Sequence, residues 1–103
     1  MAGPMRIRAT TTEGVTEVKV LMTHPMETGL RKNPDGSLVP AHHITEVTAM
    51  LNDKVVLEAQ WGPAVSQNPF VAFRFKGGKS GDKVTVSWKD NLGETQSGDT
   101  TLA

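Results

Sequence analysis

The sequence contains no cysteine. This absence excludes disulfide bonds, a thiolate nucleophile, cysteine-based zinc sites and blue-copper ligation. It does not decide the cellular compartment, because cysteine-free domains occur on both sides of a membrane.

The chain also lacks an excess of charge of either sign. Its 11 basic and 11 acidic residues balance, and the sequence pI is about 6.8. Such a balance indicates neither a nucleic-acid-binding surface nor an acidic tail. No apolar run approaches membrane-spanning length, and residues 1–8 contain no hydrophobic stretch of a secretory signal. We expect no nucleic-acid partner, no membrane contact and no signal peptide in this chain.

A recognisable catalytic set is missing as well. No serine lies in a nucleophile elbow, and no H-E-x-x-H motif occurs. Gly78-Lys79-Ser80 resembles the end of a phosphate-binding loop, but the glycine required five positions earlier is replaced by Phe73, and no helix is expected to follow. We interpret residues 77–82 as a hairpin loop, and we predict that the protein is not an enzyme.

The apolar pattern has a period of two and no convincing period of 3.6. Val18, Val20 and Met22, for example, alternate with more polar neighbours, which is typical of a strand with one buried face. The pattern predicts strands near residues 5–10, 15–23, 43–51, 54–61, 70–76, 84–88 and 94–102. The side chains expected to face inward are Val18, Val20, Leu57, Trp61, Val71, Phe73, Phe75, Val84, Val86 and Trp88.

Seven short strands at about ten-residue spacing predict an all-β fold. We expect an immunoglobulin-like antiparallel β-sandwich that forms a single domain over residues 1–103. The term describes the architecture only, because the Cys…Trp…Cys pattern of antibody domains is absent.

Residues 18–44 begin and end as strands, and the connection between them is unusual. His24-Pro25 should end the first strand, because proline removes a backbone donor and restricts the residue before it. Asn33-Pro34-Asp35-Gly36 predicts a reverse turn at the far end of the connection. An ordered connection of about twenty residues in a small domain indicates a function.

The three histidines flank this connection, with Met22, Met26 and Glu27 nearby. Histidine with a thioether or a carboxylate could hold copper, zinc or iron. Adjacent strand residues point to opposite faces, so His42 and His43 cannot easily share one ion. We favour polar loop histidines. The alternative is a small metal-dependent redox enzyme that uses His24, His42 or His43.

Two irregular stretches, residues 22–32 and 61–70, combine proline and glycine with large apolar side chains. Met26, Leu30 and Phe70 have no periodic reason to be inside, and exposed apolar residues in constrained loops more often mark a partner surface than a catalytic site. The residues that we predict to bind a partner are His24, Met26, Glu27, Leu30, Arg31, Pro69 and Phe70.

The same two stretches carry a resemblance to a known family. V-K-V-L-M-T-H-P-M-E-T-G-L-R-K (residues 18–32), with Pro34-Asp35-Gly36 and Leu38-Val39-Pro40, resembles the signature of the SoxZ family. W-G-P-A-V-S-Q-N-P-F (residues 61–70) and F-R-F-K-G-G (residues 73–78) are similar to the second half of that family. The resemblance extends over about residues 5–100.

The resemblance implies the non-catalytic subunit of the SoxYZ sulfur-carrier complex, which acts in bacterial thiosulfate oxidation in the periplasm. In that family the partner, SoxY, holds sulfur intermediates on a cysteine of its C-terminal arm while the Sox enzymes act in turn. A chain without cysteine cannot be the covalent carrier, which agrees with this role. The resemblance implies a heterodimer with SoxY, contact with the Sox enzymes through that complex, no cofactor and no metal.

Two further expectations follow. A periplasmic subunit without its own signal should be exported together with a signal-bearing partner. An interaction subunit purified without its partner keeps an uncovered apolar patch, so we expect isolated chains to pair through that patch or through an edge strand as a symmetric homodimer.

Overall fold

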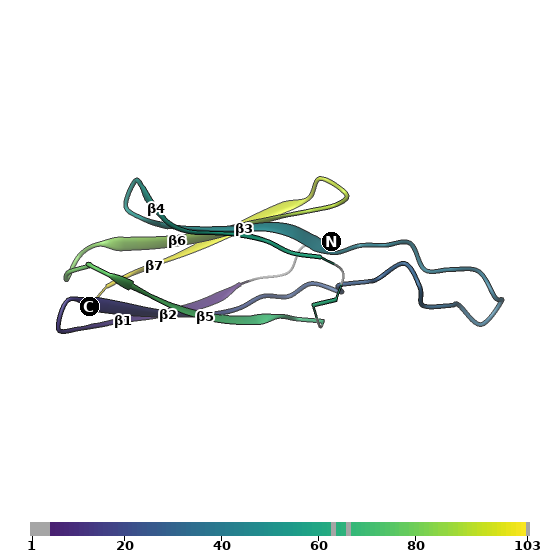
Figure 1. Cartoon of the computed structure of the whole chain (residues 1–103), viewed down its shortest axis with the longest axis horizontal. Helices are drawn as coiled ribbons and strands as arrows, with labels where there is room; N and C mark the ends of the chain where they lie inside the picture. The colour runs from purple at the N-terminus through teal and green to yellow at the C-terminus, as the bar shows by residue number, and fades with distance from the viewer. Residues whose placement is uncertain (1–4, 63, 66, 103) are drawn as a thin grey trace.

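A computed structural model describes residues 5–62, 64–65 and 67–102 of the chain (Figure 1). The seven strands are β1 (Arg6–Thr12), β2 (Val15–Leu21), β3 (Ile44–Leu51), β4 (Lys54–Gln60), β5 (Phe70–Lys76), β6 (Lys83–Asp90) and β7 (Thr95–Thr101). The described residues form no helix, and so they include none with the length and hydropathy needed to cross a membrane. The predicted all-β sandwich is confirmed.

The strands form two antiparallel sheets that face each other (Figure 1). The three-stranded sheet has the order β1-β2-β5, and the four-stranded sheet has the order β4-β3-β6-β7. At one side of the sandwich β1 and β7 pack against each other. Among the described residues no comparably extensive contact joins β4 and β5, the edge strands at the other side. The sandwich is therefore closed along one side and more open along the other.

Alternation along the central strands builds the core between the sheets. Val18 and Val20 of β2 and Val84 and Val86 of β6 are completely buried, and Trp88 is 2% exposed. Burying an aliphatic side chain of this size contributes roughly 1.5–3 kcal/mol. These five predicted core residues lie where the period of two places them.

The other five predicted core residues face inward but are only partly buried. Leu57 and Trp61 lie on or just after β4, and Val71, Phe73 and Phe75 lie on β5. They pack against the margin of the core and keep part of their surface exposed. The cause is strand order: β4 and β5 are edge strands, so each has a neighbour on one side only.

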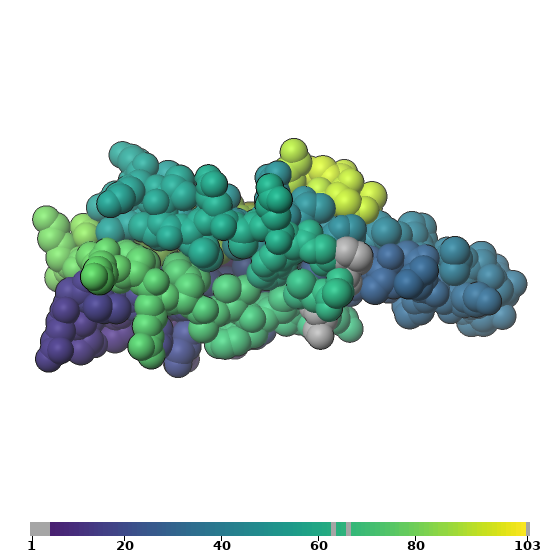
Figure 2. Space-filling view, in the orientation of Figure 1, coloured from purple at the N-terminus to yellow at the C-terminus, as the bar shows by residue number. Residues whose placement is uncertain are grey.

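The long connection between β2 and β3 forms a two-stranded arm. Isolated bridges join Glu27 to His42 and Lys32 to Leu38. At the tip the Asn33 amide donates to the Ser37 carbonyl at 2.7 Å and the Gly36 amide donates to the Asn33 carbonyl at 3.0 Å, which confirms the predicted reverse turn. The arm extends beyond the sandwich (Figures 1 and 2), so the molecule measures 55 Å along its long axis and 20 Å across.

Candidate functional site at the base of the arm

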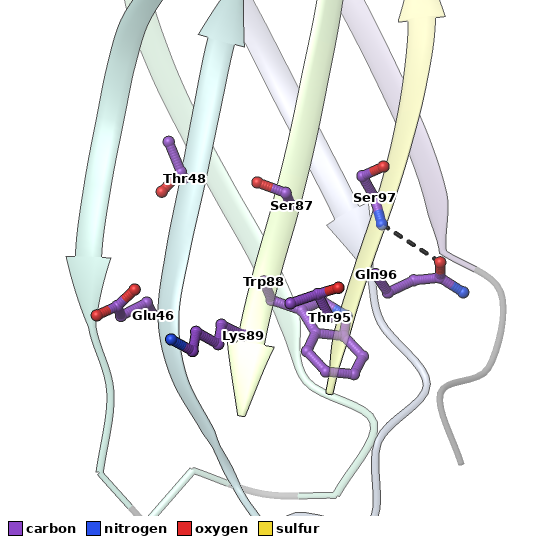
Figure 3. Close-up of a pocket in the computed structure, with 8 residues that line it drawn as sticks. All are labelled: Glu46, Thr48, Ser87, Trp88, Lys89, Thr95, Gln96 and Ser97. Atoms are coloured by element: carbon purple, nitrogen blue, oxygen red, sulfur yellow. Dashed lines mark hydrogen bonds between the residues drawn. The ribbon is translucent and has the colours of Figure 1, made fainter. Parts of the chain in front are cut away.

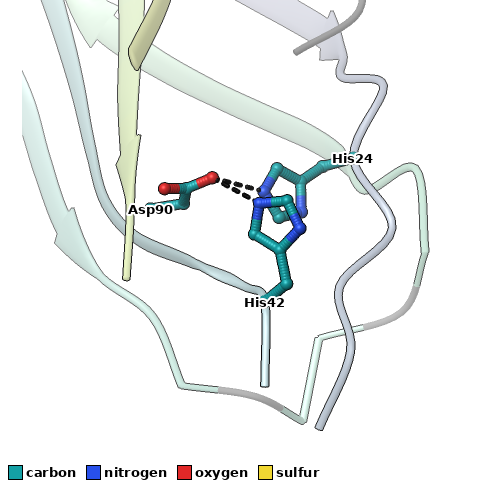
Figure 4. Close-up of side chains that lie close together, drawn as sticks. All are labelled: His24, His42 and Asp90. Atoms are coloured by element: carbon teal, nitrogen blue, oxygen red, sulfur yellow. Dashed lines mark hydrogen bonds and ion pairs between the residues drawn. The ribbon is translucent and has the colours of Figure 1, made fainter. Parts of the chain in front are cut away.

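The base of the arm contains a buried polar cluster of His24, His42 and Asp90, which we call the clasp (Figure 4). His24 follows the end of β2, His42 precedes β3, and Asp90 is the last residue of β6. His24 is 1% exposed and Asp90 is 2% exposed, while His42 is partly buried. The clasp therefore joins both ends of the arm to the four-stranded sheet.

Both histidine rings are directed at one oxygen of Asp90 (Figure 4). His24 Nε2 lies 3.1 Å and His42 Nε2 lies 2.7 Å from Asp90 Oδ2. Asp90 Oδ1 accepts hydrogen bonds from the backbone amides of Leu92, at 3.0 Å, and Glu94, at 2.9 Å. Each carboxylate oxygen thus has two donors, as a buried charged group requires.

These contacts decide the charge of Asp90. Burial by itself would raise the pKa of the carboxyl, because a charge is poorly solvated in the interior. The hydrogen bonds from His24, His42 and the two backbone amides outweigh burial, and they lower the pKa from 3.8 to about 2. Asp90 is therefore ionised at neutral pH.

The tautomer of His24 follows from its two neighbours. The Met26 amide donates to His24 Nδ1 at 3.0 Å. A neutral imidazole that accepts at Nδ1 carries its proton on Nε2, so His24 donates that proton to Asp90. Burial lowers the pKa of His24, and the hydrogen bond to Asp90 only partly opposes this effect. His24 is thus a neutral donor held in one orientation.

Aromatic packing fixes the same ring from its sides. The His24 ring lies edge to face with Trp88, with ring centres 5.0 Å apart, and with His42, with ring centres 4.5 Å apart. Met26 lies at the base of the arm, and its sulfur accepts a hydrogen bond from the Ile44 amide at 3.4 Å. The base of the arm is therefore a rigid, closely packed element.

A second set of contacts joins the clasp to the loop before β5. The His24 amide donates to Asn68 Oδ1 at 3.0 Å, and the Asn68 amide donates to the His24 carbonyl at 2.9 Å. The Met22 amide donates to the Pro69 carbonyl at 3.0 Å. The start of the first stretch singled out in the sequence, residues 22–32, thus lies against the end of the second, residues 61–70.

Of the predicted partner-binding residues, Leu30, Arg31 and Phe70 lie on the surface. Leu30 is 80% exposed and Phe70 is 62% exposed. Arg31 is exposed and forms a two-point ion pair with the partly buried Glu27, with Arg31 Nε 3.0 Å from Glu27 Oε1. These four residues remain available for contact with a partner.

His24, Met26 and Pro69, which were also predicted to bind a partner, lie inside the molecule. Met26 adopts a φ of 48°, and this left-handed turn accompanies a side chain that packs inward, against Ile44. Their side chains therefore shape the base of the arm and do not themselves present a surface.

The histidines separate as strand alternation predicted. His24 and His42 meet in the clasp, whereas His43 does not belong to it. Sequence reasoning missed Asp90. Its position gave a signal, because Asp90 continues the buried alternation of β6 through Val84, Val86 and Trp88.

The clasp also resembles a metal-binding set. The donor atoms of His24, His42 and Asp90 all lie within 4.8 Å of one another. Two imidazoles and a carboxylate suit zinc or iron. A metal at His24 Nε2 would, however, require the proton to move to Nδ1, which faces the Met26 amide donor. Metal-bound histidines normally direct that second N–H at an acceptor, so the tautomer inferred from the Met26 contact opposes metal binding.

A solvent-open hollow of about 420 Å³ lies on β3, β6 and β7 of the four-stranded sheet (Figure 3). None of the predicted site residues lines it. The lining residues are Glu46, Thr48, Ser87, Trp88, Lys89, Thr95, Gln96 and Ser97. They are mostly neutral polar groups, with one acid and one base, and they form no nucleophile–base pair of the kind that hydrolases use.

Comparison with known proteins gives one family and one recurrent fold. A family model described as "Sulphur oxidation protein SoxZ" matches residues 5–101. No curated protein matches the chain. A superoxide reductase (neelaredoxin) from Archaeoglobus fulgidus in the reduced form is 26% identical, with a TM-score of 0.63 over 96% of this chain and 88% of that chain.

Two further solved structures share the architecture. A superoxide reductase in the oxidised state is 17% identical, with a TM-score of 0.69 over 99% of this chain and 89% of that chain. A hypothetical protein from Pyrococcus horikoshii is 17% identical, with a TM-score of 0.65 over the same shares of the two chains. At this identity the likeness concerns the fold alone.

Proposed function

Because this chain belongs to the SoxZ family of sulfur oxidation proteins, we propose that it is the interaction subunit of the SoxYZ carrier complex. In this role it binds SoxY and helps to present the cysteine arm of SoxY to the Sox enzymes. The chain has no cysteine, so the covalent sulfur intermediates reside on the partner. The catalytic steps then belong to the enzymes that visit the complex.

The observation that carries this proposal is the contact between the two family stretches at the base of the arm. Asn68 and His24 exchange hydrogen bonds across the boundary between the arm and the loop before β5. The exposed Leu30 and Phe70 supply apolar contact, and the Arg31–Glu27 ion pair adds charge beside Leu30. Because the clasp holds this surface rigid, little conformational entropy is lost when a partner binds.

The family role also suggests a location. We place the complex in the periplasm, reached by export together with a partner that carries the signal. Fractionation of cells that express both subunits, with and without the signal of the partner, tests this placement. Retention of this chain in the cytoplasm despite an intact partner signal would count against it.

Co-expression with SoxY tests the main proposal. A tag on this chain should recover SoxY in a one-to-one ratio, and the complex should support thiosulfate oxidation when the Sox enzymes are added. Each subunit alone should support none. Failure to recover SoxY from a folded chain would overturn the proposal.

A second candidate is a small metal-dependent redox enzyme. It is supported by the convergence of His24, His42 and Asp90 and by the 26% identity to a superoxide reductase. The tautomer of His24 argues against it, because the Met26 amide occupies Nδ1. Elemental analysis of purified protein separates the two candidates: stoichiometric iron, zinc or copper would favour the enzyme.

A further inference from the structure

Within the part of the chain that the structure describes, no strand pairs with the outer edge of β5. In an antiparallel pair, residues alternate between those that bond to the neighbouring strand and those that face away. The Met22 amide bonds to the Pro69 carbonyl, and the Gly77 amide bonds to the Gly14 carbonyl, in the same register that pairs Val20 with Val71. The residues whose amides and carbonyls face the open edge are therefore Phe70, Ala72, Arg74 and Lys76.

Two features that usually prevent strand pairing, a proline and a bulge, are missing from this edge, although the exposed Arg74 and Lys76 give it charge. β5 contains no proline, and its register with β2 runs without a bulge from Phe70 to Lys76. By contrast, β1 packs against β7, and β4 has an irregular register with β3 at Ala49/Met50. β5 is therefore a strand of regular register whose free edge can accept a further strand.

The side chains of β5 add an apolar strip beside the free backbone. Val71, Phe73 and Phe75 face inward yet stay partly exposed, because β5 has a neighbour on one side only. Phe70 is 62% exposed at the end of the strand. A strand added at this edge would cover these surfaces as well as pair the backbone.

We propose that the occupant of this edge is a second copy of the same chain, paired antiparallel through β5 about a two-fold axis at Phe73. In this register Val71 lies opposite Phe75 of the second copy, and Phe73 lies opposite its own counterpart. On the outer face Ala72 lies opposite Arg74, and Phe70 lies opposite Lys76. No like charges meet, and the exposed ring of Phe70 packs on the lysine stem.

Neighbouring registers fit less well. An axis at Arg74 places two guanidinium groups opposite each other, which is unfavourable. An axis at Ala72 places Lys76 opposite Asn68, which lies outside the strand. The axis at Phe73 instead pairs all the edge-facing residues of both strands. The result is a continuous six-stranded sheet in the dimer.

Analytical ultracentrifugation of the isolated chain with two matched variants tests the proposal. Ala72→Pro removes an edge-facing amide without breaking a hydrogen bond to β2, whereas Ala72→Val adds a side chain and keeps the amide. We expect the wild type and Ala72→Val to form dimers, and the dissociation constant of Ala72→Pro to rise on the order of tenfold or more. A monomeric wild type, or equal dimers for both variants, would overturn the proposal.

Cross-linking tests the register and remains decisive if Ala72→Pro does not fold. Across the two-fold axis the Cα atoms of Phe73 and its counterpart should lie about 4.5 Å apart, which suits a disulfide. Since the chain has no cysteine, oxidised Phe73→Cys should give a covalent dimer. Val71→Cys should not, because its counterpart lies about 13 Å away along the strands. No cross-link for Phe73→Cys, or equal cross-linking of both variants, would exclude this register.

Discussion

His24 and Asn68, 44 residues apart in the sequence, hold each other through two hydrogen bonds that involve their backbones. The Asn68 side chain accepts from the His24 amide, and the Asn68 amide donates to the His24 carbonyl. Asn68 does this at a φ of 50°, a left-handed conformation that asparagine tolerates better than most residues. Asn68 therefore helps to connect the arm to the loop before β5, together with the hydrogen bond between Met22 and Pro69.

The first prediction concerns this connection. Asn68→Ala should lower the free energy of unfolding by about 1–2 kcal/mol, because it removes the side-chain acceptor and places alanine in a left-handed conformation. Asn68→Gly should cost less, since glycine adopts that conformation freely. Chemical denaturation measures both changes. Equal stability of Asn68→Ala and the wild type would show that the connection contributes nothing.

The second prediction concerns the clasp. Asp90→Asn should lower the free energy of unfolding by about 2–4 kcal/mol, because an amide nitrogen would face donors at one of the two carboxylate positions. Asp99→Asn is the matched control: that carboxylate is exposed and forms an ion pair with the exposed Lys83. The control should change stability by no more than about 0.5 kcal/mol. A similar effect of the two variants in urea denaturation would contradict the assigned role of Asp90.

The third prediction concerns acid stability. The folded-state pKa of Asp90 is lowered from 3.8 to about 2. The ionised carboxylate therefore adds to the free energy of unfolding above about pH 4, and this contribution is lost as the pH falls through about 2. The pKa of His24 is lowered from 6.5. The unfolded chain therefore binds that proton more readily than the folded chain, and stability declines as the pH falls below 6.5.

Both shifts have the same sign, so we expect the free energy of unfolding to decrease with acidification in two ranges. Urea denaturation between pH 7 and pH 2 measures this profile. Asp90→Asn should abolish the contribution below pH 4, whereas the exposed-site variant Asp99→Asn should retain it. A stability that stays constant from pH 7 to pH 4 would show that His24 is not held neutral by burial.

The local order of apolar and turn-forming residues was sufficient to predict the strands and the turn at the tip of the arm. The alternation through Val84, Val86 and Trp88 placed β6 and its inner face, and the turn residues at positions 33–36 placed the tip. Strand order was not available from local pattern, because pairing depends on contacts between distant segments. For this reason the sequence indicated that Phe73 faces inward but not that β5 would be an edge strand.

The candidate site was harder to predict for a related reason. His24-Pro25 has the composition of an exposed loop, so nothing near His24 in the sequence indicated its burial. His24 and Asp90 are buried together because the carboxylate receives hydrogen bonds from two imidazoles, 48 and 66 residues away in the sequence. Asp90 on the buried face of β6 was the available signal, because a carboxylate there requires partners.

The fourth prediction places the surface for SoxY. Leu30→Asp and Phe70→Asp, made separately, should each weaken SoxY binding about tenfold or more, because interfaces concentrate their energy in a few apolar anchors. Both side chains are mainly exposed, so neither change should greatly lower the melting temperature. Met26→Asp is unsuitable for this purpose, since Met26 is 5% exposed and a charge there would unfold the base of the arm.

Lys89→Asp is the control, because Lys89 is exposed on β6 in the opposite sheet from Phe70. Thermal melts should accompany the binding measurements, so that loss of binding is separated from loss of folding. Phe70→Asp could act through the β5 edge as well as through the arm, whereas Leu30→Asp tests the arm alone. If Leu30→Asp remains folded and binds SoxY with wild-type affinity while Phe70→Asp does not, the surface for SoxY lies along β5 and excludes the arm.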